Sequence, residues 1–106
     1  MLKKITSFLV MVLITFHLSL FGSEIIRVLA IGNSFSEDAV ENYLYNLGQT
    51  DDVTFIIGNM YIGGCSLETH WSNANSDAKA YSYRKISASG AKTTTANVSI
   101  AEALAD

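Results

Sequence analysis

The sequence predicts an α/β fold built on a mostly parallel sheet, and three observations lead to this prediction. A near-continuous apolar run from Glu24 to Gly32 is typical of a strand buried on both faces. The apolar spacing then becomes helical, and a second strand-like run begins at Val53. Strand, helix and strand in this order form a βαβ unit, which implies parallel strands and a right-handed crossover.

The helix of this unit is expected to span roughly Glu37 to Leu47. Its apolar side chains fall at the spacing of one helix face: Val40, Tyr43, Leu44 and Leu47. Asp38 and Glu41 bring acidic side chains to the first turn, where the helix dipole favours them. Gly48 is a plausible stop signal.

The second half of the sequence predicts a loop, a hairpin and the start of another helix. The polar stretch 66–77 suggests a short helical turn within a loop. Strand-favouring Tyr, Thr and Val residues on either side of Ser89-Gly90 predict a β-hairpin over 81–98. Ser99 and Glu102 have the spacing of a capping box, so a helix should begin there.

The first 23 residues have the pattern of a secretory signal peptide. Lys3 and Lys4 precede an apolar stretch from Ile5 to Phe21, and small residues follow it. We therefore expect residues 24–106 to be exported, to the periplasm or outside the cell. If the segment is not cleaved, it would anchor the chain in a membrane.

Charge and composition narrow the kinds of partner. Without Lys3 and Lys4, five of the seven basic residues remain against ten acidic ones, which argues against nucleic acid. No His, Cys, Asp and Glu cluster has metal-ligand spacing, and no cofactor is expected. The single cysteine, Cys65, cannot form an internal disulfide and is expected to be a small buried side chain.

Two loops that follow the predicted strands carry the candidate chemistry. They are Gly32-Asn33-Ser34 and Gly63-Gly64-Cys65-Ser66. If the strands are neighbours, the loops lie side by side at the carboxyl edge of the sheet, where ligands bind in such folds. Ser34 could then attack an acyl group while its own amide and that of Gly64 stabilise the oxyanion.

Simpler interpretations of the same residues remain open. Ser34 and Glu37 also have capping-box spacing, so Ser34 could only cap the helix, and Ser36 could do the same. Gly63-Gly64 could be a plain turn.

Two segments together resemble the SGNH (GDSL-type) hydrolase superfamily. They are VLAIGNSFSEDA and, about thirty residues later, MYIGGCSLETHW. The pair is more narrowly similar to a secreted bacterial branch of unknown function, which has Gly-Asn-Ser-Phe-Ser in its first block. That branch also has a Tyr-x-Tyr stretch, as in Tyr81-Ser-Tyr83 here. The resemblance covers the mature chain from Ile25 to Asp106.

The resemblance implies a flavodoxin-like three-layer sandwich with about five parallel strands. This chain would hold about the first two strands, one crossover helix, the β-hairpin and the start of a second helix. Ser34 matches the family nucleophile and Gly64 the oxyanion-hole glycine, whereas Asn33 replaces the usual aspartate. The family base belongs to an Asp-x-x-His block that this sequence does not contain.

His70 is a second candidate for the base, with Glu68 as its orienting carboxylate. The alternative is a loop histidine that bonds nearby, with Trp71 packed beside it.

These observations lead to three hypotheses about function. The first is an exported serine esterase that acts on a small-molecule or glycan ester through a Ser34 acyl-enzyme, and that is inactive as this chain alone. The second is a non-catalytic carbohydrate-binding module that uses the loop around His70, Trp71 and Asn73. The third is a truncated reading frame without function.

Overall fold

The computed structural model describes residues 22–106, so the expected signal peptide lies almost wholly outside the described residues. The strands are β1 (Glu24–Gly32), β2 (Val53–Tyr61), β3 (Tyr81–Ile86) and β4 (Lys92–Val98). The helices are α2 (Ser34–Ser36), the π-helix η1 (Glu37–Leu44), α3 (Tyr45–Thr50), α4 (Leu67–Ser76) and α5 (Ile100–Leu104). Within residues 22–106 no helix is long and apolar enough to cross a membrane.

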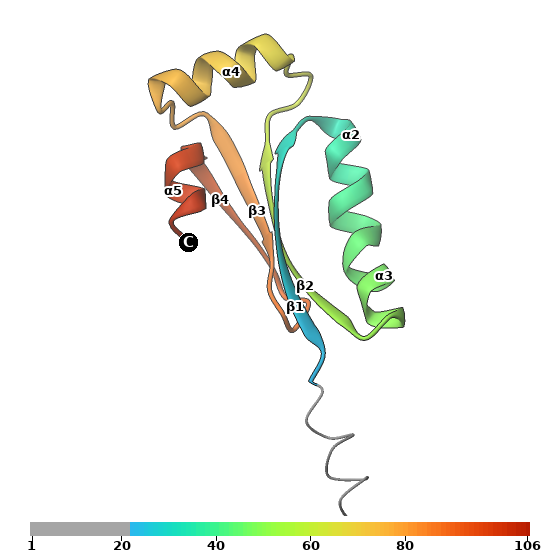
Figure 1. Cartoon of the computed structure of the whole chain (residues 1–106). Helices are drawn as coiled ribbons and strands as arrows, with labels where there is room; N and C mark the ends of the chain where they lie inside the picture. The colour runs from blue at the N-terminus through green and yellow to red at the C-terminus, as the bar shows by residue number, and fades with distance from the viewer. Residues whose placement is uncertain (1–21) are drawn as a thin grey trace, which may run out of the picture.

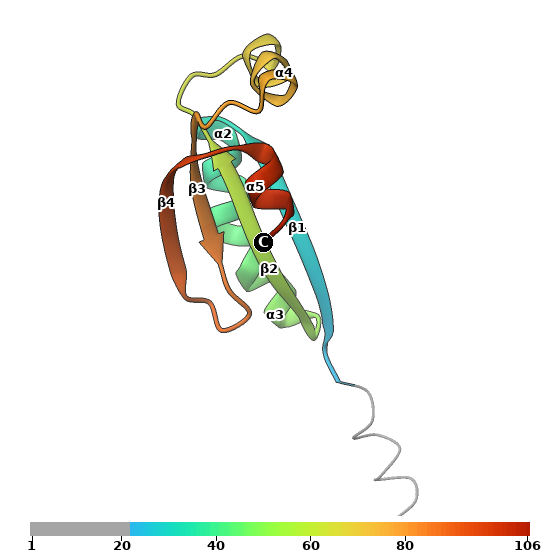
Figure 2. The ribbon, with the colours of Figure 1, turned by 90° about the vertical axis from the view of Figure 1, so that its left-hand side faces the viewer.

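The sheet confirms the predicted α/β fold. Its strands follow chain order, β1-β2-β3-β4, and β1 pairs with β2 in parallel, as a βαβ unit requires (Figures 1 and 2). The predicted hairpin is β3 and β4, and β3 joins the sheet by antiparallel pairing with β2. The sheet of the described residues is therefore mixed.

The prediction that the first strand is buried on both faces is wrong. Ile25 is 60% exposed and Ile31 is 43% exposed. The reason is the position of β1 at the edge of the sheet, with helices α2, η1 and α3 on one side and only short α5 on the other (Figure 2). The fully buried apolar side chains lie instead on the inner strands: Ile57 and Met60 on β2 and Tyr81 on β3.

The crossover helix is longer than predicted. It runs from Ser34 to Thr50 as α2, η1 and α3 without a break, so Gly48 lies inside it rather than at its end. The chain turns instead at Asp51-Asp52, where Asp52 has a positive φ of 58°.

The predicted apolar face of this helix is also wrong. Tyr43 and Leu47 are about 60% exposed, although Val40 and Leu44 are partly covered. The less exposed positions recur every four residues rather than every 3.6: Ser36, Glu37, Val40, Glu41, Leu44, Tyr45 and Gly48. The wider turns of a π-helix explain this longer repeat, because each turn holds more residues than an α-helical turn.

The stretch expected to be a short helical turn is a ten-residue helix, α4. Ser66 begins it, and its side chain accepts a hydrogen bond from the amide of Thr69. The helix ends at Asp77, which has left-handed backbone angles. The sequence missed its length because only one α4 residue, His70, is buried, so no apolar face is visible.

The face of the sheet opposite the crossover helix is covered mainly by α5. The predicted capping box of Ser99 and Glu102 is confirmed, with both reciprocal hydrogen bonds present. Ala103 of α5 packs with Met60 and Tyr81 to form the small core on this face. Beside α5, a cavity of about 260 Å³ extends over β1 and β2, so this face is incompletely filled.

Replacing Gly48 with Ala should destabilise the fold. A β-carbon there would lie 2.5 Å from Phe55 Cδ2 and 2.7 Å from the carbonyl oxygen of Val53, and that backbone atom cannot easily move. We expect Gly48→Ala to lower the free energy of unfolding by about 1–3 kcal/mol in urea denaturation. The matched control is Asn46→Ala, an exposed position in the same helix, which should be neutral or slightly stabilising. A Gly48→Ala variant that gains stability like the control would contradict this packing.

Tyr83 should titrate well above the ordinary value for a tyrosine side chain. Burial raises the pKa of Tyr83, and the carboxylate of Asp106, which accepts a hydrogen bond from the Tyr83 hydroxyl at 2.9 Å, raises it further. Together they bring this pKa to about 12. Because this pKa exceeds the unfolded value of about 10, the associated stability is present below pH ~10 and is lost as pH rises through the folded pKa. Ultraviolet titration of tyrosinate measures the shift. Asp106→Asn should lower this pKa only in part, since burial remains; an unchanged pKa would refute the role of Asp106.

Candidate functional site

The two candidate loops lie side by side because β1 and β2 end together. In the parallel register Gly32 is opposite Tyr61, the last residue of each strand. The amide of Ile62 then donates a hydrogen bond to the carbonyl of Gly32 at 3.2 Å. The structure therefore brings together the segments that carry Ser34 and Gly64.

Asn33 fastens one loop to the other and begins the crossover helix. Its Oδ1 accepts a hydrogen bond from the amide of Phe35, so Asn33 is the N-cap. Its Nδ2 donates to the carbonyl of Cys65 at 3.1 Å. The alternative that Ser34 or Ser36 caps the helix is wrong, because the chain becomes helical at Ser34, one residue after Asn33.

The amide group of Asn33 suits this double role better than a carboxylate would. An asparagine side chain both donates and accepts, whereas an ionised aspartate only accepts. An aspartate could still cap the helix, but its second oxygen would face the carbonyl oxygen of Cys65. Asparagine at position 33 thus has a structural reason in this chain.

Ser34 is exposed at the first position of the helix. Among residues 22–106, no hydrogen bond engages its hydroxyl, and its amide is one of the free donors at a helix N-terminus. The hydroxyl is therefore accessible and is not used to hold the fold together.

Gly64 lies in the neighbouring loop with a positive φ of 65°, a conformation that side chains rarely adopt. No atom lies within 4 Å of the place where a β-carbon would stand, so a ligand can approach the backbone here. Its amide makes no hydrogen bond to another described residue. Both amides of the predicted oxyanion hole are thus available.

His70 is buried, and its contacts are with Tyr81 and Cys65 rather than with Ser34. Its Nδ1 is 2.9 Å from the hydroxyl of Tyr81 and 3.6 Å from Sγ of Cys65, and its ring stacks on Tyr81. No hydrogen bond joins His70 to Ser34 in the described part of the chain, and Glu68 is exposed. The position of His70 agrees with the alternative interpretation of a histidine that bonds nearby. Trp71, expected to pack beside it, is 71% exposed.

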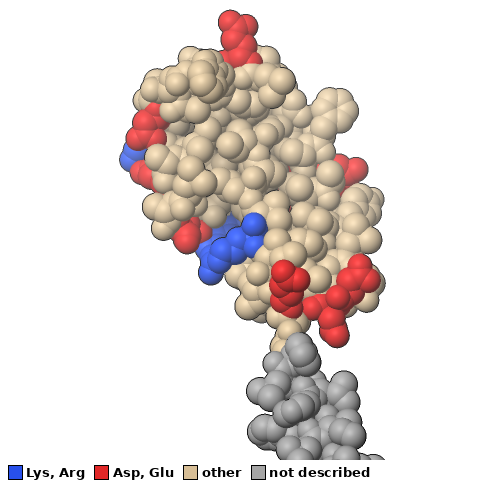
Figure 3. Space-filling model, in the orientation of Figure 1, with Lys and Arg blue, Asp and Glu red and all other residues tan. Residues whose placement is uncertain are grey.

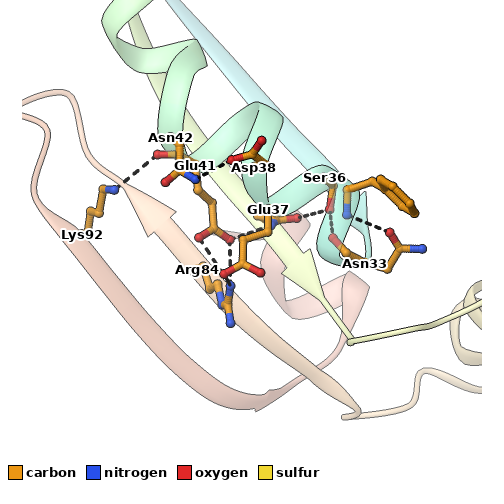
Figure 4. A network of polar contacts seen from close by, with 10 residues as sticks. Asn33, Ser36, Glu37, Asp38, Glu41, Asn42, Arg84 and Lys92 are labelled. Atoms are coloured by element: carbon orange, nitrogen blue, oxygen red, sulfur yellow. Dashed lines mark hydrogen bonds and ion pairs between the residues drawn. The ribbon is translucent and has the colours of Figure 1, made fainter.

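A polar network that the sequence analysis missed lies behind the two loops (Figure 4). Ser36 donates to the carbonyl of Asn33 at 2.8 Å and also lies 3.3 Å from Oδ1 of Asn59. Asn59, which is fully buried on β2, donates to Glu41 at 2.6 Å. One signal was available in the sequence: an asparagine within an apolar strand needs a buried partner.

Arg84 closes this network from β3. It forms ion pairs with Glu37 at 2.8 Å and with Glu41 at 3.3 Å, and its guanidinium lies 3.9 Å from the ring centre of Tyr61. Burial alone would lower the pKa of Arg84, but the two glutamates outweigh burial and raise it. The network links the helix layer to β2 and β3, and it offers no group of three or more metal ligands within residues 22–106.

Replacing Asn33 with Asp should separate the two loops. The variant keeps the helix cap but loses the donor to Cys65, so the free energy of unfolding should fall by about 1–3 kcal/mol at neutral pH. Protonation of the new carboxyl at acidic pH should recover part of this loss, because a protonated acid can donate. Urea denaturation at both pH values measures the effect. Asn46→Asp, the same change at an exposed position of the same helix whose side chain makes no hydrogen bond in the described part of the chain, is the control; equal losses in both variants would refute the clamp.

The comparisons with known proteins agree with this architecture. None of the curated proteins matches the chain. A crystal structure at 1.50 Å resolution of a DUF4886 family protein from Bacteroides uniformis ATCC 8492 matches with 58% identity and a TM-score of 0.74. The match covers 78% of this chain but only 32% of the relative's chain. Residues 27–106 match the model of a domain of unknown function (DUF4886), and the chain therefore belongs to the DUF4886 family.

Proposed function

We propose that this chain carries the nucleophile and oxyanion-hole portion of an SGNH-type serine esterase, and that it acts outside the cytoplasm. The observation that carries the proposal is the arrangement of the strand ends. Ser34, with a free hydroxyl, lies in a loop that Asn33 ties to the loop of Gly64, whose amide is also free. The substrate class is an acyl ester of a small molecule or a glycan.

The chemistry that such a site supports is acyl transfer. The oxygen of Ser34 attacks the ester carbonyl, and its proton passes to a general base. The amides of Ser34 and Gly64 donate to the oxyanion that forms. The base then protonates the alcohol as it leaves, and water hydrolyses the acyl-enzyme by the reverse sequence of proton transfers.

The general base in this proposal comes from outside the described residues. His70 is committed to Tyr81 and Cys65 through Nδ1, and the printed sequence holds no Asp-x-x-His block. Without a base, the oxyanion hole alone gives only a small part of the rate enhancement of a serine hydrolase. The chain by itself should therefore hydrolyse esters very slowly.

A chimera tests the proposal. This chain is joined to the part of the solved relative that it does not match, and hydrolysis of p-nitrophenyl acetate is followed. We expect the chimera to turn over and Ser34→Ala to lower kcat/KM by at least about 10³-fold. Ser72→Ala, the same change on the exposed surface of α4, should leave the rate unchanged. A folded chimera whose turnover survives Ser34→Ala, or that has none, would sink the esterase proposal.

A carbohydrate-binding module is the second candidate, and exposed Trp71 favours it. An indole that is 71% exposed can stack on the apolar face of a sugar ring. Glycan binding that depends on Trp71 but not on Ser34, in a chimera without ester hydrolysis, would support this candidate over the first.

A further inference from the structure

The helices cover the two faces of the sheet very unequally. One face carries the continuous segment α2-η1-α3, whereas α5, with five residues, crosses the other (Figure 2). Large apolar side chains are exposed on β1, α4 and α5: Ile25, Ile31, Leu67, Trp71 and Leu104. The part of this mixed sheet formed by β1 and β2 is parallel, and parallel strands are normally covered on both faces, so the surface over β1 lacks a layer.

The outer edge of β1 is free in the described residues. Within residues 22–106 no strand lies beyond β1, and its nine residues contain no proline. Its charged residues, Glu24 and Arg27, lie in its first half, so the half nearer α4, residues 28–32, is uncharged. Figure 3 views the molecule from this edge and shows a broad area without charged side chains below α4. Proteins usually protect exposed edges with charge, proline or a covering element, so the uncharged half of β1 is the part of this edge suited to pairing.

His70 gives this surface a buried ring nitrogen that needs a hydrogen-bond partner. It lines a shallow apolar pocket of about 290 Å³ together with Ile31, Leu67, Trp71, Ala74 and Ile100. The histidine is 8% exposed, and its Nε2 is buried without a hydrogen-bond partner in the described part of the chain. A buried polar atom without a partner is costly, so an interacting group is expected.

The neighbours of Nδ1 indicate what that group must be. Tyr81 and Cys65 both present a hydroxyl or thiol to Nδ1. When either donates, Nδ1 accepts and the ring proton resides on Nε2. Nε2 then needs an acceptor, such as a carboxylate or a backbone carbonyl.

We propose that the free edge of β1 and the α4 pocket form one docking surface for the part of the DUF4886 domain that this chain does not match, and that this part supplies the acceptor for Nε2 of His70. We call this the β1–α4 surface; it consists of Ile31, Leu67, His70, Trp71 and Ala74. The inference does not rest on the proposed esterase activity.

The comparison with the solved relative points to this occupant rather than to another. The relative is 58% identical over the matched part, yet that part is only 32% of its chain. The sheet of the described residues has two edge strands, and β4 is mostly polar (KTTTANV), whereas β1 is apolar towards α4 and borders the face with a missing layer. The β1 side is therefore the better surface for the other two thirds. The opposite face already has its helix layer, held by the ion pairs of Arg84.

Co-expression tests the proposal. The full chain is produced together with the tagged remainder of the solved relative, and the amount of chain captured is measured. We expect equimolar capture of the wild-type chain. Leu67→Ser/Trp71→Ser should reduce capture at least about tenfold, because exposed apolar anchors dominate such interfaces. His70→Phe, which keeps an aromatic ring but has no nitrogen, should also reduce it.

The matched control is Tyr43→Ser/Leu47→Ser, which removes similarly exposed apolar side chains from the helix layer on the opposite face. Capture of this control should equal that of the wild type, and circular dichroism verifies that every variant is folded. Ser34→Ala should also be captured normally, which separates docking from esterase activity. In the purified complex, nitrogen NMR of His70 should show a protected Nε2 proton.

Three results would overturn the proposal. The first is that the folded wild-type chain is not captured; a remainder that stays insoluble when the chain is present counts as the same result. The second is an equal loss of capture in the control pair. The third is self-association of the wild-type chain that Leu67→Ser/Trp71→Ser abolishes, since the β1–α4 surface would then bind a second copy.

Discussion

The parallel pairing of β1 with β2 is the constraint on which the rest of the structure depends. Gly32 and Tyr61 are partners at the last rung, so both strands stop at the same level of the sheet. If the register slipped by a residue, the loop after β1 would face a strand rather than a loop, and the side chains would change faces. The meeting of the two loops is a consequence of this register.

The loops are held at that level by a chain of polar contacts that runs between the helix layer and the sheet. It begins at the carbonyl of Cys65 and runs through Asn33, Ser36, Asn59 and Glu41 to Arg84. Asn59 at its centre is fully buried and the other side chains are partly buried. Such a network resists movement, because each group loses its partner if the next one moves. The exposed groups of the candidate site, Ser34 and Gly64, are thus mounted on a framework to which they contribute no side-chain bond. Such a division suits a site whose reactive atoms must stay free.

The sequence predicted the order of elements well because each depends on local patterns. The bounds of the first strand, the hairpin and the capping box of Ser99 follow from apolar runs, a Gly turn and residue spacing. It failed where tertiary contacts override these patterns. The π-helical turns displace Tyr43 and Leu47 from the core, and Asn33 caps the helix in place of Ser34 because it can also reach Cys65. The ion pairs of Arg84 join residues more than forty positions apart, and no local rule foresees them.

The strands lie in the sheet in the same order as in the chain, and this order affects how readily the chain aggregates. Each new strand adds to the side away from β1, so nothing made later within residues 24–98 ever shields the outer edge of the first strand. At high protein concentration two such edges can pair with each other and start ordered aggregates. A chain of this kind would depend on dilution, on chaperones that hold extended segments, or on prompt assembly to remain soluble.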